Sequence, residues 1–293
     1  MNVFLSPFTN PFINLALEDY FLRDASNLPL VFFYINRACV VLGRFQNPWL
    51  ECHLPYLVKN DIWLVRRQSG GGCVFHDEGN LNYSFIYPEA KINRSLGVEV
   101  LKKAFKAADI ELEISPRHDL WLEGKKISGS AFKQIKDSSF HHGTFLISSD
   151  LEKLNQSLKH TIVSKDSKSI PSVRSQVTRL KDKYPGVEIQ DVIDLVAHYF
   201  HTKPFTLDGS LLSKNEVQKS FQDLTGWQWL WGETPQFSLD TLKGPLLIHK
   251  GIIKGDTEIP FMKENLISYF EINELERLFP DFSLQQISSQ RVF

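Results

Sequence analysis

Apolar residues recur with a helical period in some segments and gather in short runs in others, so the sequence predicts both helices and strands. Between Ile13 and Phe21 the apolar positions lie three or four residues apart and form one stripe of an amphipathic helix. Asn10 and Pro11, just before this stripe, are suited to the N-cap and the first turn of that helix. Further helices are predicted over residues 95–108, 150–159 and 191–201.

Short β-prone runs bounded by turn residues predict two groups of strands. The first two strands, 30–35 and 39–42, are expected to pair with each other around the polar residues Asn36 and Arg37. Because strands follow one another in groups, the pattern predicts an α+β fold with mixed or antiparallel sheets and not a Rossmann alternation. The remaining predicted strands are 62–67, 73–77, 81–87, 111–115, 119–122, 126–130 and 144–148.

The pattern changes after Phe237. A hairpin is predicted from 244–253 and 257–259, turning at residues 254–256, and two short helices over 262–270 and 272–278. We therefore expect a large domain over residues 1–235 and a small α/β domain over 236–293. About 55 residues give little independent stability, so the small domain should pack on the large one.

Composition narrows the class of protein. The chain has 293 residues, of which 42% are hydrophobic, which is enough for a full core. The formal net charge of −1 argues against a nucleic-acid-binding protein. Three cysteines without a CxxC pair fit a reducing compartment, and no apolar run approaches the roughly 20 residues that span a membrane. We expect a cytoplasmic monomer, or a protein of the mitochondrial matrix if a transit peptide was removed.

The most informative segment runs from Arg66 to Asn80, RRQSGGGCVFHDEGN. Gly70, Gly71 and Gly72 remove three β-carbons in succession, so backbone N–H groups of this loop can approach an anion closely. Two adjacent arginines add donors that suit phosphate or carboxylate oxygens. No Gly-Lys-Ser/Thr follows, so this is not the phosphate loop of nucleoside triphosphatases. The alternative is a glycine-rich hairpin with solvated arginines.

This segment closely resembles the RRxSGGGxVFHDxGN signature of lipoate–protein ligase A and its lipoyltransferase relatives. The resemblance extends over about residues 4–240 without a large gap. It implies the biotin/lipoate ligase fold, with a sheet-based large domain and a small C-terminal domain. The other blocks that match, in the same order as in the family, are 10–18 (its first helix), 43–49 (GRxQNPW), 126–131 (K-[IV]-S-G-[ST]-A), 141–146 (HHGTLL), 172–180 (SVRSxVxxL), and 227–229 with 235–238 (W-x-W and P-x-F-S).

The resemblance implies an enzyme that uses ATP and Mg²⁺ to activate lipoate as lipoyl-AMP. The lipoyl group then passes to a lysine of a lipoyl domain in a 2-oxoacid dehydrogenase complex or of the glycine cleavage H protein. One alternative is a transferase of the same fold that takes lipoyl or octanoyl from lipoyl-AMP or a modified protein. A non-catalytic module that binds carrier proteins, and a biotin ligase, are further alternatives, although the QNPW and HHGT blocks favour the lipoyl branch.

Lys126 is the expected catalytic residue. Its small neighbours, among them Ser128 and Gly129, leave room for a ligand, and its ammonium can bridge a carboxylate and an α-phosphate. The alternative is a surface lysine, with Lys125 as the rival, and the resemblance selects Lys126. Strand alternation places Arg66 and Arg67 on opposite faces, and the resemblance favours Arg67 for the phosphates or the lipoate.

Other site residues rest on the resemblance. Asp119 is expected to hold Mg²⁺ or the nucleotide, the alternative being a turn residue, and Asn80 to order the loop or bind a phosphate. His142 is expected to contact lipoate. No HxxH or HExxH pattern supports a metal site formed by the protein alone. The nucleotide positions implied by the family, beyond Lys126, Arg67, Asn80 and Asp119, are Gly70, Gly71, Gly72, Cys73, Val74, Phe75, Ser128 and Gly129.

Three further assignments have alternatives. Cys73 could be a nucleophile, but the cysteine-dependent octanoyltransferases place theirs in a different motif. Val74, Phe75 and Phe85 could line an apolar tunnel for the lipoyl chain or belong to the ordinary core. The Ser-, Lys- and Thr-rich segment 159–183 reads either as a lid or as a plain exposed loop.

Overall fold

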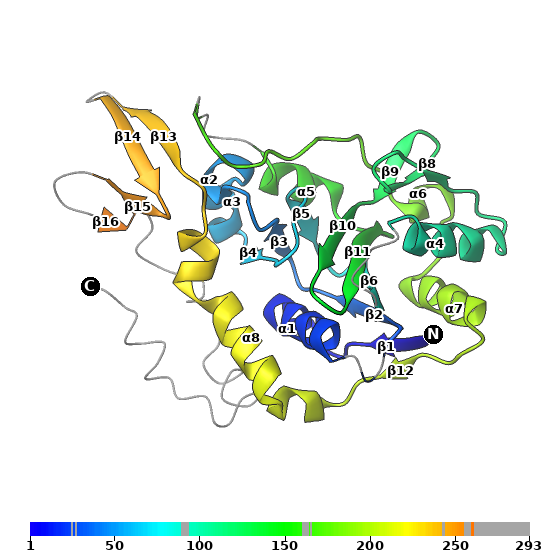
Figure 1. Ribbon diagram of the computed structural model, residues 1–293. Helices are drawn as coiled ribbons and strands as arrows, with labels where there is room; N and C mark the ends of the chain where they lie inside the picture. Colours follow the sequence, from blue (N-terminus) through cyan, green and yellow to red (C-terminus); the bar gives the residue numbers. More distant parts are fainter. Residues whose placement is uncertain are drawn as a thin grey trace.

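A six-stranded mixed sheet lies at the centre of the fold (Figure 1). The computed structural model describes residues 1–24, 26, 28–88, 94–159, 164, 166–241, 244–254 and 259–260. Neighbouring strands are antiparallel from β10 through β11 and β6 to β2, whereas β1 runs parallel to β2 and to β12. The bounds are β1 Asn2–Leu5, β2 Leu30–Ile35, β6 Asn80–Tyr87, β10 Ser130–Gln134, β11 Ser139–Leu146 and β12 Phe205–Thr206.

A second sheet has three strands in the order β4-β3-β5, which are Trp63–Arg66, Cys39–Leu42 and Val74–His76. The expected pairing of β2 with β3 is therefore wrong, although both strands have the predicted bounds. The reason is Asn36: its side chain is fully buried and bonded to Asn14 and His76. The link between the strands crosses from one sheet to the other instead of making a tight turn.

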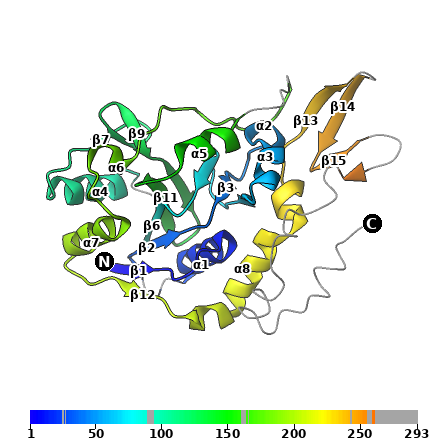
Figure 2. The same ribbon diagram turned by 180° about the vertical axis from the view of Figure 1, so that it is seen from behind.

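The two faces of the central sheet are buried by different helices. On one face Val31, Phe33 and Phe85 pack with apolar residues of α4 and α7. On the other face Phe32 and Tyr34 pack with α1, α8 and the three-stranded sheet. Helices α1 and α8 lie side by side, as Figures 1 and 2 show from opposite directions. The bounds are α1 Pro11–Arg23, α4 Leu96–Lys106, α7 Ile189–Tyr199 and α8 Asn215–Thr225.

Helix α1 begins where the sequence predicts. Asn10 caps it, and its side-chain oxygen accepts hydrogen bonds from the backbone N–H groups of Phe12 and Ile13. The α+β class is confirmed, and most predicted elements are found within a few residues of their expected ends. The smaller helices are α2 Pro48–Glu51, α3 Leu54–Lys59, α5 Leu151–Ser157, α6 Leu180–Lys183, the 3-10 helix η2 Gly209–Ser213 and the π-helical turn η3 Gln228–Gly232.

Two smaller sheets complete the described fold. One is formed by β7 (Glu113–Ile114), β8 (Leu120–Leu122) and β9 (Lys125–Ser128). The other is formed by β13 (Phe237–Thr241), β14 (Gly244–His249), β15 (Ile252–Ile253) and β16 (Ile259–Pro260).

The last sheet differs in part from the expected hairpin. Ile253 pairs with Ile259 as predicted, but a further turn occurs at Lys250 and Gly251, whose φ angles are 51° and 72°. A turn with two residues in the left-handed region tightly reverses the chain, so the predicted strand 244–253 is divided in two. The predicted helices 262–270 and 272–278 lie outside the described residues, and the proposed domain boundary at 235/236 stays a prediction.

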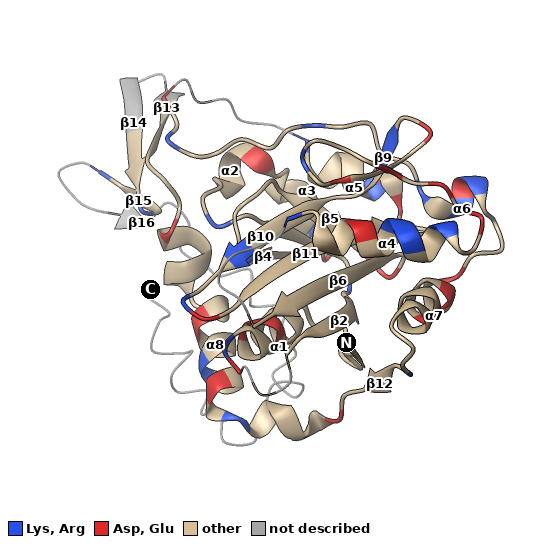
Figure 3. Cartoon of the chain, turned by 45° about the vertical axis from the view of Figure 1, so that its right-hand side comes forward, with Lys and Arg blue, Asp and Glu red and all other residues tan. Residues whose placement is uncertain are grey.

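Charged side chains are mixed over the outer helices. Figure 3 shows acidic and basic residues next to one another on α4 and α8. This distribution agrees with the net charge of −1. None of the described helices combines the length and the apolar character needed to cross a membrane.

Arg66 joins segments that are far apart in the sequence. Its side chain is fully buried, and every hydrogen bond it donates goes to an uncharged acceptor. Burial lowers the pKa of this guanidinium to about 10, so it stays charged at neutral pH. The acceptors are the carbonyls of Gly43, Arg44, Gln46 and Leu230 and the hydroxyl of Thr234, at 2.8–3.3 Å.

We expect Arg66→Met to lower the free energy of unfolding by about 3–5 kcal/mol, because it leaves several buried carbonyls without donors. Urea denaturation measures this loss. The control is Arg179→Met at an exposed ion pair with Asp182, which should change stability by less than about 1 kcal/mol. Equal losses in the two variants would contradict a structural role for Arg66.

Candidate active site

Two cavities adjoin one another between the central sheet and the three-stranded sheet. Their volumes are about 190 and 300 Å³. Both are lined by Lys126, Gly129 and Thr144 on one side and by Cys73 and Val74 on the other. The cavities therefore adjoin one another along these shared residues, and Lys126 is one of them.

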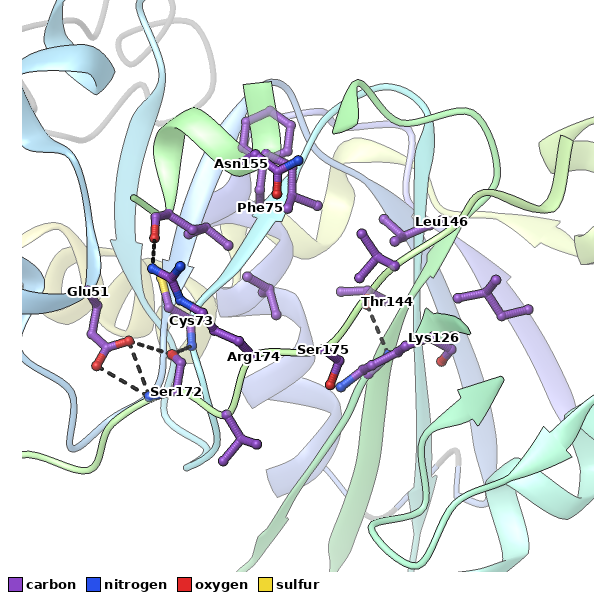
Figure 4. A pocket seen from close by; sticks show the side chains of 18 residues that line it. Glu51, Cys73, Phe75, Lys126, Thr144, Leu146, Asn155, Ser172, Arg174 and Ser175 are labelled. Carbon is purple, nitrogen blue, oxygen red and sulfur yellow. Dashed lines mark hydrogen bonds between the residues drawn. The ribbon is translucent and has the colours of Figure 1, made fainter. Parts of the chain in front are cut away.

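The first cavity has a largely apolar wall. Figure 4 shows Phe75, Leu146 and Asn155 among its lining side chains. Arg174 crosses its edge, and its Nη2 donates to the carbonyl of Leu158 at 3.2 Å. A flat, weakly polar ring system with a charged tail toward Lys126 would fit such a wall.

The second cavity lies against one face of the central sheet. Residues Tyr34, Asn82 and Thr144 are directly opposite one another on β2, β6 and β11, and all three line it. Val74 and His76 of β5 form the facing wall. Phe85 lies on the other face, in the core with α4 and α7, so of its two interpretations the ordinary core is the correct one.

Lys126 is held from several directions. Its Nζ lies 3.0 Å from Oδ2 of Asp119, and its backbone N–H donates to the carbonyl of Gln176 at 2.9 Å. A Cβ at Gly129 would lie 3.1 Å from Cε of Lys126 and 3.2 Å from Nζ. Gly129 thus leaves space for the Lys126 side chain, and the room expected for a ligand stays a prediction. Lys125 on the same strand is exposed.

Asp119 closes a turn and also lines a cavity, and its expected role in holding Mg²⁺ or the nucleotide stays a prediction. Its backbone closes a turn, because its carbonyl accepts from Ser115 at 2.9 Å. Its carboxylate lines the second cavity, where Oδ1 accepts from the backbone N–H of Ser130 at 3.1 Å and Oδ2 pairs with Lys126. The side chain is therefore fixed by two contacts.

Arg67 shapes the glycine-rich loop. Its Nη2 donates to the carbonyls of Gly70 and Gly72 at 2.7 and 2.8 Å, its Nε to Ser69 Oγ at 2.9 Å, and its Nη1 to the Val41 carbonyl at 3.0 Å. Burial lowers its pKa to about 10. Four of its five N–H groups are used by the protein, so at most one is left for a ligand in the second cavity.

The close packing of the glycine-rich loop requires glycine at two positions, one inside the loop and one in the segment beside it. Gly71 has a φ of +90°, and a Cβ there would lie 2.8 Å from Nη2 of Arg67. A Cβ at Gly43 would lie 2.0 Å from the carbonyl oxygen of Gly71. Cys73 and Val74 follow directly and line both cavities, as the sequence predicted for nucleotide contacts, whereas Gly70 lines neither.

Ser172 connects the segment after residue 166 to the rest of the site. Its Oγ donates to Glu51 Oε2 at 2.5 Å and accepts from the backbone N–H of Cys73 and from Nε2 of Gln46, both at 2.9 Å. This segment therefore covers both cavities from one side; whether it opens as a lid stays a prediction. Cys73 Sγ lies 3.8 Å from Sγ of the buried Cys52.

His142 belongs to a buried chain of polar side chains. Its Nδ1 lies 2.9 Å from Oε1 of Glu18, and its Nε2 lies 2.8 Å from Oγ of Ser69. His142 lines the second cavity, as expected of a residue near lipoate, but Ser69 lines neither cavity. Asn80 also lines neither, because its side chain turns to Asn82.

His141 faces away from the cavities. Its ring stacks on Phe132 with centroids 4.7 Å apart, and burial lowers its pKa to about 3, so it is neutral. No group of three or more His, Cys, Asp or Glu side chains placed to hold a metal ion occurs in the described part of the chain.

The sequence did not single out several residues of the site as functional: Glu18, Glu51, Gln46, Tyr34 and Ser172. Glu18, Gln46 and Ser172 lie in blocks that match the family, and Glu18 is a carboxylate facing the apolar side of α1. A buried charge in an apolar stripe is a usable signal, since such a group needs a partner. Glu51 and Tyr34 carry no such signal.

Comparisons with known proteins give a consistent result. Residues 10–201 match the family model of the lipoyl protein ligase A/B catalytic domain. The chain is similar to the lipoate-protein ligase A of Psychrobacter cryohalolentis, with 35% identity over 81% of this chain and 74% of that protein. The corresponding protein of Bdellovibrio bacteriovorus is 34% identical over the same shares.

Solved structures share the fold. LipL1 of P. falciparum in complex with lipoate has a TM-score of 0.70 at 23% identity, covering 99% of this chain and 94% of that one. A lipoate-protein ligase A bound with ATP has a TM-score of 0.60 at 24% identity, covering 76% and 94%. The bipartite ligase of Thermoplasma acidophilum, solved with its E2 lipoyl domain, has a TM-score of 0.63 at 22% identity, covering 78% and 96%.

Proposed function

The chain belongs to the family of lipoyl protein ligase A/B catalytic domains, and we propose that it is an ATP-dependent lipoate–protein ligase. It activates lipoate as lipoyl-AMP and passes the lipoyl group to a lysine of a lipoyl domain in a 2-oxoacid dehydrogenase complex or of the glycine cleavage H protein. The observation that carries the proposal is that Lys126 lines two adjoining cavities. One cavity can hold the acid and the other the adenosine, with the reacting groups between them.

Activation of an acid by ATP joins two anions. A carboxylate oxygen of lipoate attacks the α-phosphorus, the bond to pyrophosphate breaks, and a mixed anhydride forms. Fixed positive charge at the point of attack is the main means of catalysis for such a step. The ammonium of Lys126 supplies a compact charge there, and Asp119 at 3.0 Å holds it in place.

The residues present fit both substrates. In the second cavity Leu15, Val41 and Ala131 offer apolar contacts for an alkyl chain. In the first, the apolar wall suits an adenine ring. Mg²⁺ would accompany ATP as a charge-neutralising ion, and Asp119 is the carboxylate that lines the second cavity nearest to Lys126.

Transfer then requires an acceptor lysine. Its neutral amine attacks the acyl carbon, AMP leaves, and the new amide nitrogen loses a proton. The described structure offers Lys126 to stabilise the departing AMP, as the same charge serves both steps. We further propose that the protein acts as a cytoplasmic monomer, as the sequence suggested.

Purified protein given ATP, Mg²⁺, lipoate and an apo lipoyl domain should modify one lysine of that domain, as measured by mass spectrometry. Lipoyl-AMP should replace lipoate plus ATP. Modification with lipoyl-AMP alone would contradict the ligase and leave a transferase of the same fold. No modification of a competent acceptor in either case would indicate a missing partner subunit or transfer of lipoyl from another protein.

Replacing Lys126 by Ala should leave the protein folded and slow lipoate-dependent ATP–pyrophosphate exchange by at least two to three orders of magnitude, about 3–4 kcal/mol. The physical reason is the loss of the charge between the two anions. Lys125→Ala, one residue earlier on β9 and exposed, is the matched control and should exchange at the normal rate. Normal exchange by folded Lys126→Ala protein would remove Lys126 from the mechanism.

Gly71→Val should abolish measurable ATP binding with a loss of about 1–3 kcal/mol in unfolding free energy. Valine is strained at a φ of +90° and would push the Arg67 guanidinium out of the loop. Gly70→Val is the control, because a Cβ at Gly70 would meet nothing within 4 Å. If calorimetry finds the same ATP affinity in both variants, the loop does not cradle the nucleotide.

A further inference from the structure

The second cavity extends away from Lys126 toward a group of polar side chains. Val74 and Thr144 mark the junction, since both line both cavities. His76 lies two residues further along the strand of Val74, about 7 Å deeper. Tyr34 lies two strands across from Thr144, about 10 Å away. If the carboxylate of an acid lies at Lys126, its tail reaches this polar end.

A chain of hydrogen bonds fixes the orientation of the His76 ring. The amide nitrogen of Asn14 donates to a main-chain carbonyl at 2.9 Å, and the amide oxygen accepts from Ser6 Oγ at 2.5 Å. The same nitrogen of Asn14 donates to Oδ1 of Asn36 at 2.8 Å. The amide nitrogen of Asn36 is then the atom 3.0 Å from Nδ1 of His76. Nδ1 must therefore be the acceptor of that bond.

The ring proton of His76 consequently sits on Nε2. Burial lowers the pKa of His76 to about 3, so the ring stays neutral at physiological pH. No described residue hydrogen-bonds Nε2, and this atom is open to the second cavity. The Nε2–H group of His76 is thus a neutral donor that the described residues leave for a ligand or a water.

The other polar groups at this end differ from His76. Burial and the nearby Glu18 carboxylate raise the pKa of the Tyr34 hydroxyl well above its ordinary value, so it stays protonated. Asn82 donates to the Tyr34 carbonyl at 3.2 Å and accepts from Asn80 at 3.1 Å. Both ring nitrogens of His142 have partners within 3.0 Å. His76 differs from Asn82 and His142 in that its N–H has no hydrogen-bond partner among the described residues.

We propose that His76 is a specificity-determining residue, whose Nε2–H donates to a sulfur of the dithiolane ring and so favours lipoate over octanoate. The proposal rests on the function proposed above and adds a preference between its two candidate acids. A plain alkyl tail displaces water from Nε2–H and offers no acceptor, which leaves a buried donor unsatisfied. A dithiolane sulfur is a weak but polarizable acceptor, so the gain is modest.

The affinities of the unmodified protein for three acids distinguish the effect of a hydrogen bond to sulfur from the effect of ring shape. They are lipoate, octanoate, and the pentanoate that carries a cyclopentyl ring in place of the dithiolane. Calorimetry should show lipoate binding about three- to tenfold more tightly than the cyclopentyl acid, as expected for one weak hydrogen bond. Equal affinity of these two acids would show that only ring shape matters and would overturn the proposal.

Two variants test the residue itself. His76→Leu should bring the lipoate-to-cyclopentyl affinity ratio close to one, because it removes both the bond to lipoate and the unsatisfied donor that weakens binding of the cyclopentyl acid. His76→Gln retains an amide N–H and should keep part of the ratio. A ratio in folded His76→Leu protein that equals that of the unmodified protein would overturn the assignment. If His76→Leu does not fold, the ligand series with the unmodified protein still decides.

The outcomes also separate this inference from the proposed function. Failure of all three acids to bind, together with no pyrophosphate exchange, would refute the ligase proposal. Binding and exchange with every acid, without preference for the dithiolane, would leave the ligase proposal intact and refute the role of His76.

Discussion

Two neighbouring guanidinium groups, buried and facing opposite ways, organise the site. Arg66 ties the end of β4 to the 43–46 loop and the 230–234 segment, while Arg67 folds the glycine-rich loop back on itself. Most of their hydrogen bonds go to main-chain carbonyls. A buried charge without such acceptors would be very unfavourable, so the surrounding backbone has little freedom. The geometry of both cavities depends on this constraint.

Much of the fold could be predicted because the local signals were strong. The strands of residues 30–35 and 39–42 have the predicted ends, and Asn10 caps α1. The partners of these strands could not be predicted. Both strands are apolar on both faces, so the spacing of their apolar residues does not indicate which strand lies beside them. Helix α8 was missed altogether: its apolar face, with Val217, Phe221 and Leu224, is short and surrounded by polar residues.

The site, too, contains residues that the sequence could indicate and others that it could not. Lys126 and Gly71 stand in contiguous motifs, so the sequence alone could point to them. Ser172 and Glu51 are 121 residues apart, and both the hydroxyl and the backbone N–H of Ser172 donate to the Glu51 carboxylate, a contact that no local pattern encodes. The proton of His76 is placed on Nε2 by a chain of hydrogen bonds through Asn14 and Asn36. The direction of these hydrogen bonds follows from the tertiary structure and not from any local pattern.

The cavity wall to which Ser172 contributes also bears on the order in which the protein folds during synthesis. Its partners Gln46, Glu51 and Cys73 are synthesised about a hundred residues earlier. Until the segment through Val177 has emerged from the ribosome and docked beside Lys126, the first cavity lacks one side. A ligand that needs that side stabilises only the finished fold. The sheets must therefore form and persist without help from the substrates, and the buried arginines have to be satisfied by the chain itself.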